Sequence, residues 1–148
     1  LTTLEGSPKE VHGLFDCSDN KLSLLDGAPS RVNGNFFCSS NNLVSLENGP
    51  KFVGGSVYDC NDNNIKSFKG FPTNHRSGID VYFKGSPVDE IYEFFKTPKA
   101  ITHMNEWEVI DTTDMTISYA RFVEVFNEIG QNVPPKEYFT FKHYTLID

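Results

Sequence analysis

Hydrophobic and polar positions alternate in a block that occurs three times in the first half of the chain. The stretches FDCSDNKL (15–22), FFCSSNNL (36–43) and YDCNDNNI (58–65) each place an aromatic residue two positions before a cysteine. An asparagine follows three positions after the cysteine, and an aliphatic residue two positions later. An alternation with a period of two is typical of a short β-strand whose aromatic and cysteine side chains face the same way. Each block therefore predicts one short strand.

The same period of 21 or 22 residues holds in further columns of aligned residues. These are Asn20, Asn41 and Asn63; Leu1, Leu22, Leu43 and Ile65; Leu4, Leu25, Leu46 and Phe68; Pro8, Pro29, Pro50 and Pro72; and Val11, Val32 and Val53. The third copy has one extra residue in GGSV (54–57), and a fourth copy begins at Ile65 and decays. We expect Ile79, Val81 and Lys84 to take its aromatic, cysteine and asparagine places. Repeats of this kind stack, because no single copy can bury its apolar side alone.

The repeat resembles a known family. Written as one unit, V-x-G-x-F-x-C-x-x-N-x-L-x-x-L-x-G-x-P resembles the leucine-rich-repeat core L-x-x-L-x-L-x-x-N/C-x-L, with Phe and Cys in two of the leucine places. Its short length and its proline resemble the short leucine-rich repeats of bacterial secreted effectors. The stretch LTTLEGSPKEVHG (1–13) is similar to repeat proteins of tailed phages and bacteria. The resemblance covers about residues 1–83 and implies a leucine-rich-repeat solenoid with a short-stranded parallel β-sheet.

The pattern changes from strands and turns to helices near Ser86. A Ser-Pro opening with acidic residues after it predicts a helix over 87–96, and the Thr97-Pro98 pair predicts a second one to about 106. The apolar stripe of DMTISYARFVEVFNEIG predicts a third over 116–129 that stops at Gly130. The stretch EYFTFKHYTLI (137–147) predicts a strand or hairpin arm. We therefore expect an α+β chain, with a solenoid at 1–85 and a mainly helical C-terminal cap with a terminal strand at 86–148.

The residues between the inward positions predict a surface that binds a partner. If Phe15, Phe36 and Tyr58 point inward, their neighbours form three outward columns on the concave face of the sheet. The predicted partner-binding residues are Leu14, Asn35 and Val57; Asp16, Phe37, Asp59 and Asp80; and Ser18, Ser39, Asn61 and Tyr82. Gly78 would complete the first column. Exposed apolar and aromatic side chains are typical of a protein-binding patch. Scattered exposed residues that bind nothing are the alternative.

The columns of cysteine and aspartate could in principle bind a metal ion or act in catalysis. No two cysteines are close in the sequence and no histidine recurs with them, so a structural column of buried thiols is favoured over zinc or a nucleophile. Asp16, Asp59 and Asp80 raise the possibility of calcium, which wants six to eight oxygen ligands, but Phe37 interrupts that column. We expect no cofactor, no metal and no enzyme activity. The expected function is a non-enzymatic protein-interaction module, and the resemblance implies a phage or bacterial inhibitor or adaptor that binds a host protein.

Charge adds one alternative and excludes others. The net charge of −7 lies mainly in residues 87–148, which contain five Lys or Arg against eleven Asp or Glu. A basic footprint for direct nucleic-acid binding is absent, whereas an acidic decoy that imitates nucleic acid through the C-terminal part is the alternative function. No apolar run is long enough to span a membrane. Three cysteines without short-range pairing indicate a reducing compartment, so we expect a cytoplasmic protein, in the host cytoplasm if phage-encoded. Leu1 falls in mid-pattern, which leads us to expect residues upstream.

Overall fold

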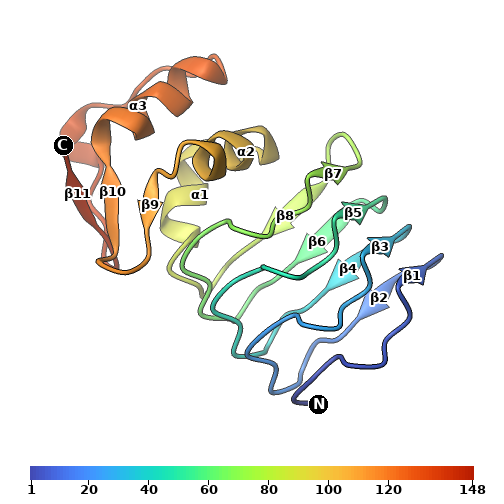
Figure 1. Cartoon of the computed structure of the whole chain (residues 1–148). Helices are drawn as coiled ribbons and strands as arrows, with labels where there is room; N and C mark the ends of the chain where they lie inside the picture. The colour runs from blue at the N-terminus through green and yellow to red at the C-terminus, as the bar shows by residue number, and fades with distance from the viewer. The chain divides into compact units, whose positions relative to one another are not determined.

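The chain divides into two compact units. The computed structural model describes all 148 residues, and the units are Leu1–Asp89 and Glu90–Asp148. Figure 1 shows coils of short strands in the first unit, and helices with a small sheet in the second. The chain is thus an α+β protein whose first unit is a β-solenoid. Its leucine-rich-repeat assignment, and a capping role for its helices, stay predictions.

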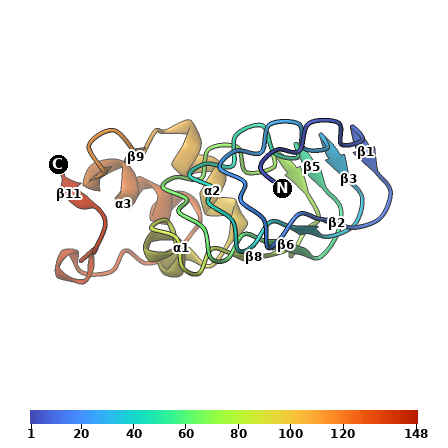
Figure 2. The same ribbon diagram turned by 90° about the horizontal axis from the view of Figure 1, so that it is seen from below.

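The solenoid contains two parallel sheets of four strands each. One sheet has the order β1-β3-β5-β7 and the other β2-β4-β6-β8, so neighbours in each sheet are one coil apart. The strands are β1 (Glu10–Val11), β2 (Phe15–Asp16), β3 (Arg31–Val32), β4 (Phe36–Phe37), β5 (Phe52–Val53), β6 (Val57–Asp59), β7 (Asn74–His75) and β8 (Asp80–Tyr82). Figure 2 shows the two rows along separate sides of the coils. The sequence predicted the strands of the β2-β4-β6-β8 sheet. It did not predict the β1-β3-β5-β7 sheet, whose first three strands contain the valine column.

The predicted inward columns form the core. Phe36, Tyr58 and the aliphatic residues Leu22, Leu43 and Ile65 have no exposed surface. Full burial of one such side chain stabilises a fold by about 1.5–3 kcal/mol relative to leaving it in water. The rings stack from coil to coil, with centroids 6.0 Å apart for Phe15 and Phe36 and 5.1 Å apart for Phe36 and Tyr58. The alternation in the sequence thus predicted the core correctly.

The asparagine column joins each coil to the one before it. The Asn41 side-chain Nδ2 donates to the carbonyl oxygens of Cys17, Cys38 and Ser39, at 3.0–3.2 Å. Its Oδ1 accepts the backbone N–H of Leu22 at 3.0 Å. Asn63 repeats the pattern one coil later and accepts the N–H of Leu43. These buried amides satisfy backbone groups that would otherwise lose their partners on leaving the strand, so the recurring asparagines form a bracket between coils.

The backbone next to each asparagine is left-handed. The column of Asn20, Asn41, Asn63 and Ser86 is called the ladder below. The residues that precede it have φ between 54° and 90°; they are Asp19, Ser40, Asp62 and Gly85. A non-glycine residue held at positive φ is strained, and the surrounding hydrogen bonds must offset that strain. The chain therefore turns by the same route in every coil.

Glycines form the corner between the two sheets. The Gly34 N–H donates to the Gly13 oxygen at 2.9 Å, and the Gly55 N–H to the Gly34 oxygen at 3.0 Å. A Cβ added to Gly34 would lie 2.6 Å from the Gly13 carbonyl carbon, which is too close for any side chain. Between the positions aligned with Val11 and Phe15 lie three residues in the first two coils (12–14 and 33–35), four in the third (54–57) and five in the fourth (76–80).

This growing corner corrects the predicted register of the fourth copy. Val81 pairs with Tyr58 and so takes the aromatic place, not the cysteine place that we expected. Ser86, not Lys84, takes the asparagine place, because its Oγ accepts the N–H of Ile65 at 3.0 Å. Val88 follows Ser86 by two residues, as Leu43 follows Asn41, and is fully buried, which puts Val88 in the aliphatic column. The insertion was invisible in the sequence because no cysteine or asparagine marks the fourth copy.

The helices of the second unit follow the predicted order with shifted ends. They are α1 (Asp89–Phe95), α2 (Pro98–Glu106), α3 (Tyr119–Glu128) and a short 3₁₀ turn, η1 (Lys136–Tyr138). Helix α1 begins later than predicted, because Ser86 belongs to the last coil rather than to a helix cap. Thr97 caps α2 as expected, accepting the Lys99 N–H, and Gly130 follows α3 with φ 73°.

A small mixed sheet accounts for the remaining differences. Its order is β11-β10-β9, from β11 (Thr145–Ile147), β10 (Thr116–Ser118) and β9 (Ile110–Asp111). The predicted third helix was too long at its start, since residues 116–118 pair as a strand and Ser118 then caps α3. The predicted terminal strand is confirmed only at 145–147, because residues 136–138 form the 3₁₀ turn.

A cluster of aromatic side chains and one carboxylate hold the C-terminal arm, residues 139–147. Phe122 packs against Phe95 and Phe139, with ring centroids 5.2 Å and 5.1 Å away. The Glu90 carboxylate accepts the backbone N–H groups of Lys142 and His143, and lies 2.6 Å from the His143 ring Nδ1. Three contacts to one carboxylate fix the loop that leads into β11.

We predict that Asn41→Ala lowers the free energy of unfolding by about 2–4 kcal/mol, because it leaves several buried backbone groups without partners. Urea unfolding followed by circular dichroism measures the change. Asn42→Ala is the matched control, since Asn42 is the neighbouring asparagine and is exposed. An Asn41 variant that is no less stable than the Asn42 variant would contradict the role of the ladder.

We predict that Glu90→Ala loosens the C-terminal arm, because the Lys142 and His143 amides lose their acceptor. Hydrogen exchange measured on peptides covering 140–147 should become faster, by roughly tenfold or more for the loss of a charge-assisted bond. The control is Glu93→Ala, which removes only the exposed ion pair with Lys96. Equal exchange in both variants would show that Glu90 does not hold the arm.

Candidate protein-binding surface

The β2-β4-β6-β8 sheet sets the register of the outward residues. Its aligned partners place Phe15, Phe36, Tyr58 and Val81 in one inward row. The outward columns are therefore Leu14, Asn35, Val57 and Asp80; Asp16, Phe37, Asp59 and Tyr82; and Ser18, Ser39, Asn61 and Lys84. We call these twelve residues the outward face. All the residues predicted to bind a partner lie on it. Asp80 and Tyr82 each lie one column earlier than we expected, and Gly78 lies outside.

Four of the eight polar side chains of the outward face bond to the backbone. Asn35 Oδ1 accepts the Val57 N–H at 3.1 Å, and Asn61 Oδ1 accepts the Lys84 N–H at 2.8 Å. Each of these amides reaches the next coil, which adds a second set of ties outside the core. This role could not be predicted from the sequence, because Asn35 and Asn61 stand in different columns and neither recurs.

The two aspartates of the middle column fold back on their own strand ends. Asp16 Oδ1 accepts the N–H of Ser18 at 2.9 Å, and Asp59 Oδ1 accepts that of Asn61 at 2.9 Å. These Asx turns end the strands. Because Asp80 lies in another column, the three carboxylates do not form one line. Nowhere in the chain do three His, Cys, Asp or Glu side chains gather closely enough to hold a metal ion.

Apolar side chains make up much of what the outward face offers to solvent. The exposed fraction is 59% for Leu14 and 45% for Tyr82. Phe37 and Val57 are half-buried between them. Phe37 and Tyr82 share a column, with only Asp59 between them. Large apolar groups left in water on a hydrogen-bonded sheet are typical of a contact surface.

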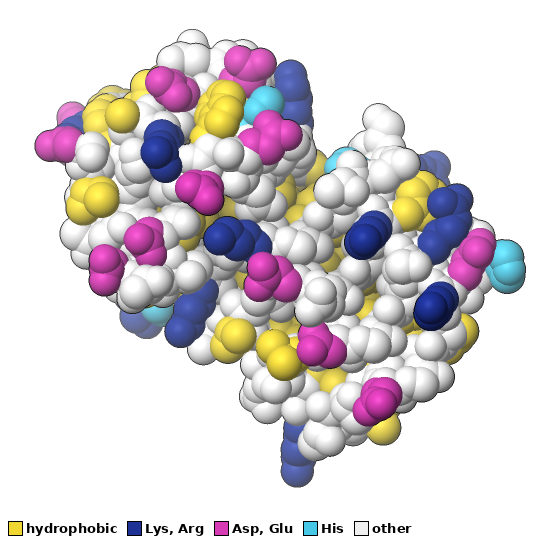
Figure 3. All heavy atoms as spheres, in the orientation of Figure 1, with side chains coloured by type: hydrophobic (Ala, Val, Ile, Leu, Met, Phe, Trp, Pro, Cys, Tyr) yellow, Lys and Arg dark blue, Asp and Glu magenta, His cyan; other side chains and the backbone are white.

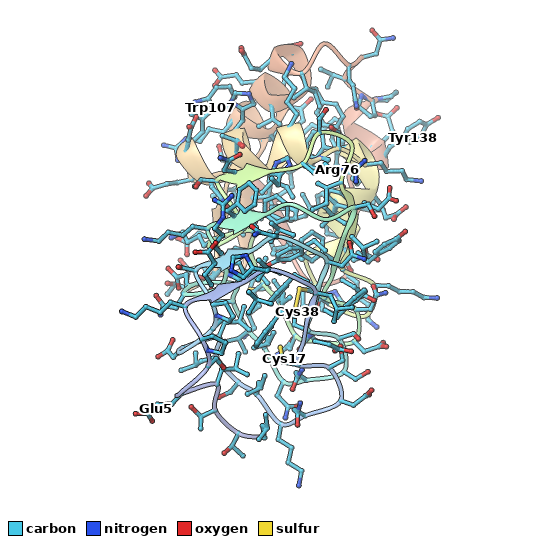
Figure 4. The ribbon with its side chains drawn as sticks, turned by 90° about the vertical axis from the view of Figure 1, so that its right-hand side faces the viewer. Glu5, Cys17, Cys38, Arg76, Trp107 and Tyr138 are labelled. Atoms are coloured by element: carbon cyan, nitrogen blue, oxygen red, sulfur yellow. A yellow bond between two sulfur atoms is a disulfide. The ribbon has the colours of Figure 1, made fainter.

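The cysteine column differs from the prediction. Cys38 and Cys60 form a disulfide, with Cα atoms 5.0 Å apart, so only Cys17 is a free thiol. The expectation of three buried thiols is wrong. Neighbouring coils of a parallel stack bring aligned residues to the separation that a disulfide needs, although 22 residues separate them in the sequence. The argument from unpaired cysteines for a reducing compartment therefore falls away. Figure 4 shows Cys17 and Cys38 inside the coils.

Burial makes Cys17 a poor nucleophile. Removal from water, together with the nearby charge of Asp16, raises the pKa of the Cys17 thiol from 9.0 to about 12. Burial likewise raises the pKa of the Tyr58 phenol, whose hydroxyl lies among the rings of the core. The Cys17 thiol loses its proton near pH 9 in the unfolded chain but only near pH 12 in the folded chain. Its contribution to the stability of the folded state is therefore fully present below pH 9. That contribution is lost as the pH rises to about 12.

Comparison with protein-family models, with curated proteins and with solved structures finds no match. The structure also contains no helix with both the length and the apolar character needed to cross a bilayer.

We predict that an alkylating reagent at pH about 8 labels no cysteine of the folded chain, because the Cys17 thiol is buried and protonated. Unfolding without a reductant should expose one reactive thiol, and unfolding with a reductant should expose three. Mass spectrometry of the intact chain counts the labels. Three labels without a reductant would contradict the disulfide, and rapid labelling of the folded chain would contradict the burial of Cys17.

Proposed function

We propose that the chain is a non-enzymatic interaction module that binds a partner protein through the outward face. The observation that supports this proposal is the exposure of Leu14 and Tyr82 beside half-buried Phe37 and Val57 on one sheet. Burying such groups against a partner removes apolar surface from water, which is the main favourable term in most protein associations. Aromatic residues are also enriched in protein interfaces.

The polar part of the outward face favours binding in a second way. Asp16, Asn35, Asp59 and Asn61 are already fixed by hydrogen bonds to the backbone. A partner therefore meets a surface whose side chains need little further ordering, which lowers the entropic cost of association. The apolar residues stand between these fixed groups, one to a coil.

The biological setting of this module rests on the resemblance of the repeats. Short leucine-rich repeats of effectors and phage proteins imply an inhibitor or adaptor that binds a host protein. We extend that implication to this chain as part of the proposal, with action in the host cytoplasm. The outward face would then supply affinity, and the helical unit would serve as a cap or as a second contact.

We predict that Phe37→Ala together with Tyr82→Ala abolishes capture of the partner, with a loss of roughly 2–4 kcal/mol expected from two aromatic interface residues. The tagged chain is first used to capture binding proteins from a bacterial lysate. Each purified partner is then titrated against the variants by calorimetry. The calorimetry also gives the stoichiometry of the complex.

The matched control is Leu24→Ala together with Val44→Ala. These residues are exposed by 52% and 41% and lie in irregular segments between strands, outside the outward face. Binding should survive in this control. A partner that binds both double variants with unchanged affinity would move the site elsewhere, provided that circular dichroism shows both to be folded.

A further inference from the structure

The β1-β3-β5-β7 sheet presents one cation from each coil. Residues 9–12, 30–33, 51–54 and 73–76 contain this sheet and its flanks. They include four Lys or Arg and a single acidic residue, Glu10, whereas the whole chain has 13 against 20. The four cations are Lys9, Arg31, Lys51 and Arg76, and we call them the basic row. Figure 3 shows dark-blue side chains gathered over these strands.

Arg31 is fixed in place by its neighbours. Its guanidinium carbon lies 3.9 Å from the centre of the Phe52 ring, and its Nε donates to Asn33 Oδ1 at 3.0 Å. The same Nε lies 3.7 Å from the Glu10 carboxylate, in an exposed ion pair. Stacking on an aromatic face holds a guanidinium without removing its charge. Arg31 is therefore a rigid cation in the middle of the row.

The other three cations have no acidic partner. Lys9, Lys51 and Arg76 are exposed, and their side chains form no ion pair. Lys9 and Lys51 occupy the same column, two coils apart. Arg76 lies one coil after Lys51 and three positions further along the strand direction, since it follows His75, the partner of Val53. At about 4.8 Å per coil, the row spans roughly 14 Å along the stack. Unpaired like charges on one sheet repel one another and attract a segment of opposite charge.

We propose that the basic row binds an extended acidic segment, rich in Asp or Glu, of a partner protein. Charge complementarity supports this occupant, because the row concentrates cations on a chain that is otherwise acidic. The site is independent of the outward face, since it lies on the other sheet of the solenoid and uses charge rather than apolar contact. A partner could engage either sheet without the other.

A nucleic acid fits this sheet less well than a peptide. Single strands bind where bases can stack on aromatic rings. The ring of Phe52, the aromatic residue in the outward row of this sheet, is already covered by Arg31. A long polyanion would also meet the net charge of −7, whereas a short peptide occupies the basic row alone.

The test measures binding of a fluorescein-labelled oligoglutamate peptide to the full chain by fluorescence anisotropy. Oligoglutamine and oligothymidylate of similar length serve as comparison probes. We expect oligoglutamate to bind at low salt, to weaken as salt rises, and to bind better than either comparison probe. Lys9→Glu together with Lys51→Glu should weaken it by about fivefold or more, since two attractions become repulsions.

The matched control is Lys21→Glu together with Lys69→Glu, which makes the same change of net charge away from this sheet. Compared at about 0.1 M salt, it should bind oligoglutamate within about twofold of the unaltered chain, because charges more than about 10 Å away are then largely screened. Equal loss in both variants would show a general charge effect and overturn the proposal. So would binding of oligothymidylate as tight as that of oligoglutamate, or no binding of oligoglutamate at low salt. Lys9→Gln with Lys51→Gln replaces the reversal if that variant does not fold.

Discussion

The buried amide at the end of each strand is the interaction on which the solenoid depends. A coil must leave its strand, turn and return within 21–23 residues, and its polar backbone must stay paired while it does so. Asn41 and Asn63 satisfy carbonyl oxygens of their own coil and of the coil before, and accept an N–H from the preceding coil. Ser86 accepts the corresponding N–H in the last coil with a hydroxyl. Because these bonds fix the register, every other column follows from them.

A fixed register separates the surface of the solenoid from its core. Each coil adds one residue to each outward column, and that residue can change without disturbing the buried rings. The β2-β4-β6-β8 sheet exposes apolar residues such as Leu14 and Tyr82, and the β1-β3-β5-β7 sheet exposes the cations of the basic row. The two sheets are parts of the same coils, yet their outward residues differ in chemistry. Two chemistries are thus presented by one scaffold.

The sequence predicted what recurs and missed what occurs once. The core, the asparagine bracket and helix α2 followed from columns or caps with a known physical role. The fourth coil was placed two residues early, because its insertion at 76–80 falls where Val81 and Ser86 replace the usual aromatic and asparagine. The disulfide between Cys38 and Cys60, with Cα atoms 5.0 Å apart, was missed, because the repeat places all three cysteines in one column and does not show which two of them bond. On the surface, the sequence identified the outward residues but not that Asp16 and Asn35 bond to backbone.

Residue-resolved hydrogen exchange by nuclear magnetic resonance tests the asparagine ladder most directly. The amides to follow are those of Leu22, Leu43 and Ile65, which donate to Asn41, Asn63 and Ser86. If the ladder joins the coils, these three amides exchange as slowly as the Cys38 amide inside the sheet and at a common rate set by unfolding of the whole stack. Fast exchange at Leu22 and Leu43 would show that the coils open independently of the asparagines. Fast exchange at Ile65 alone would show that Ser86 does not complete the fourth coil.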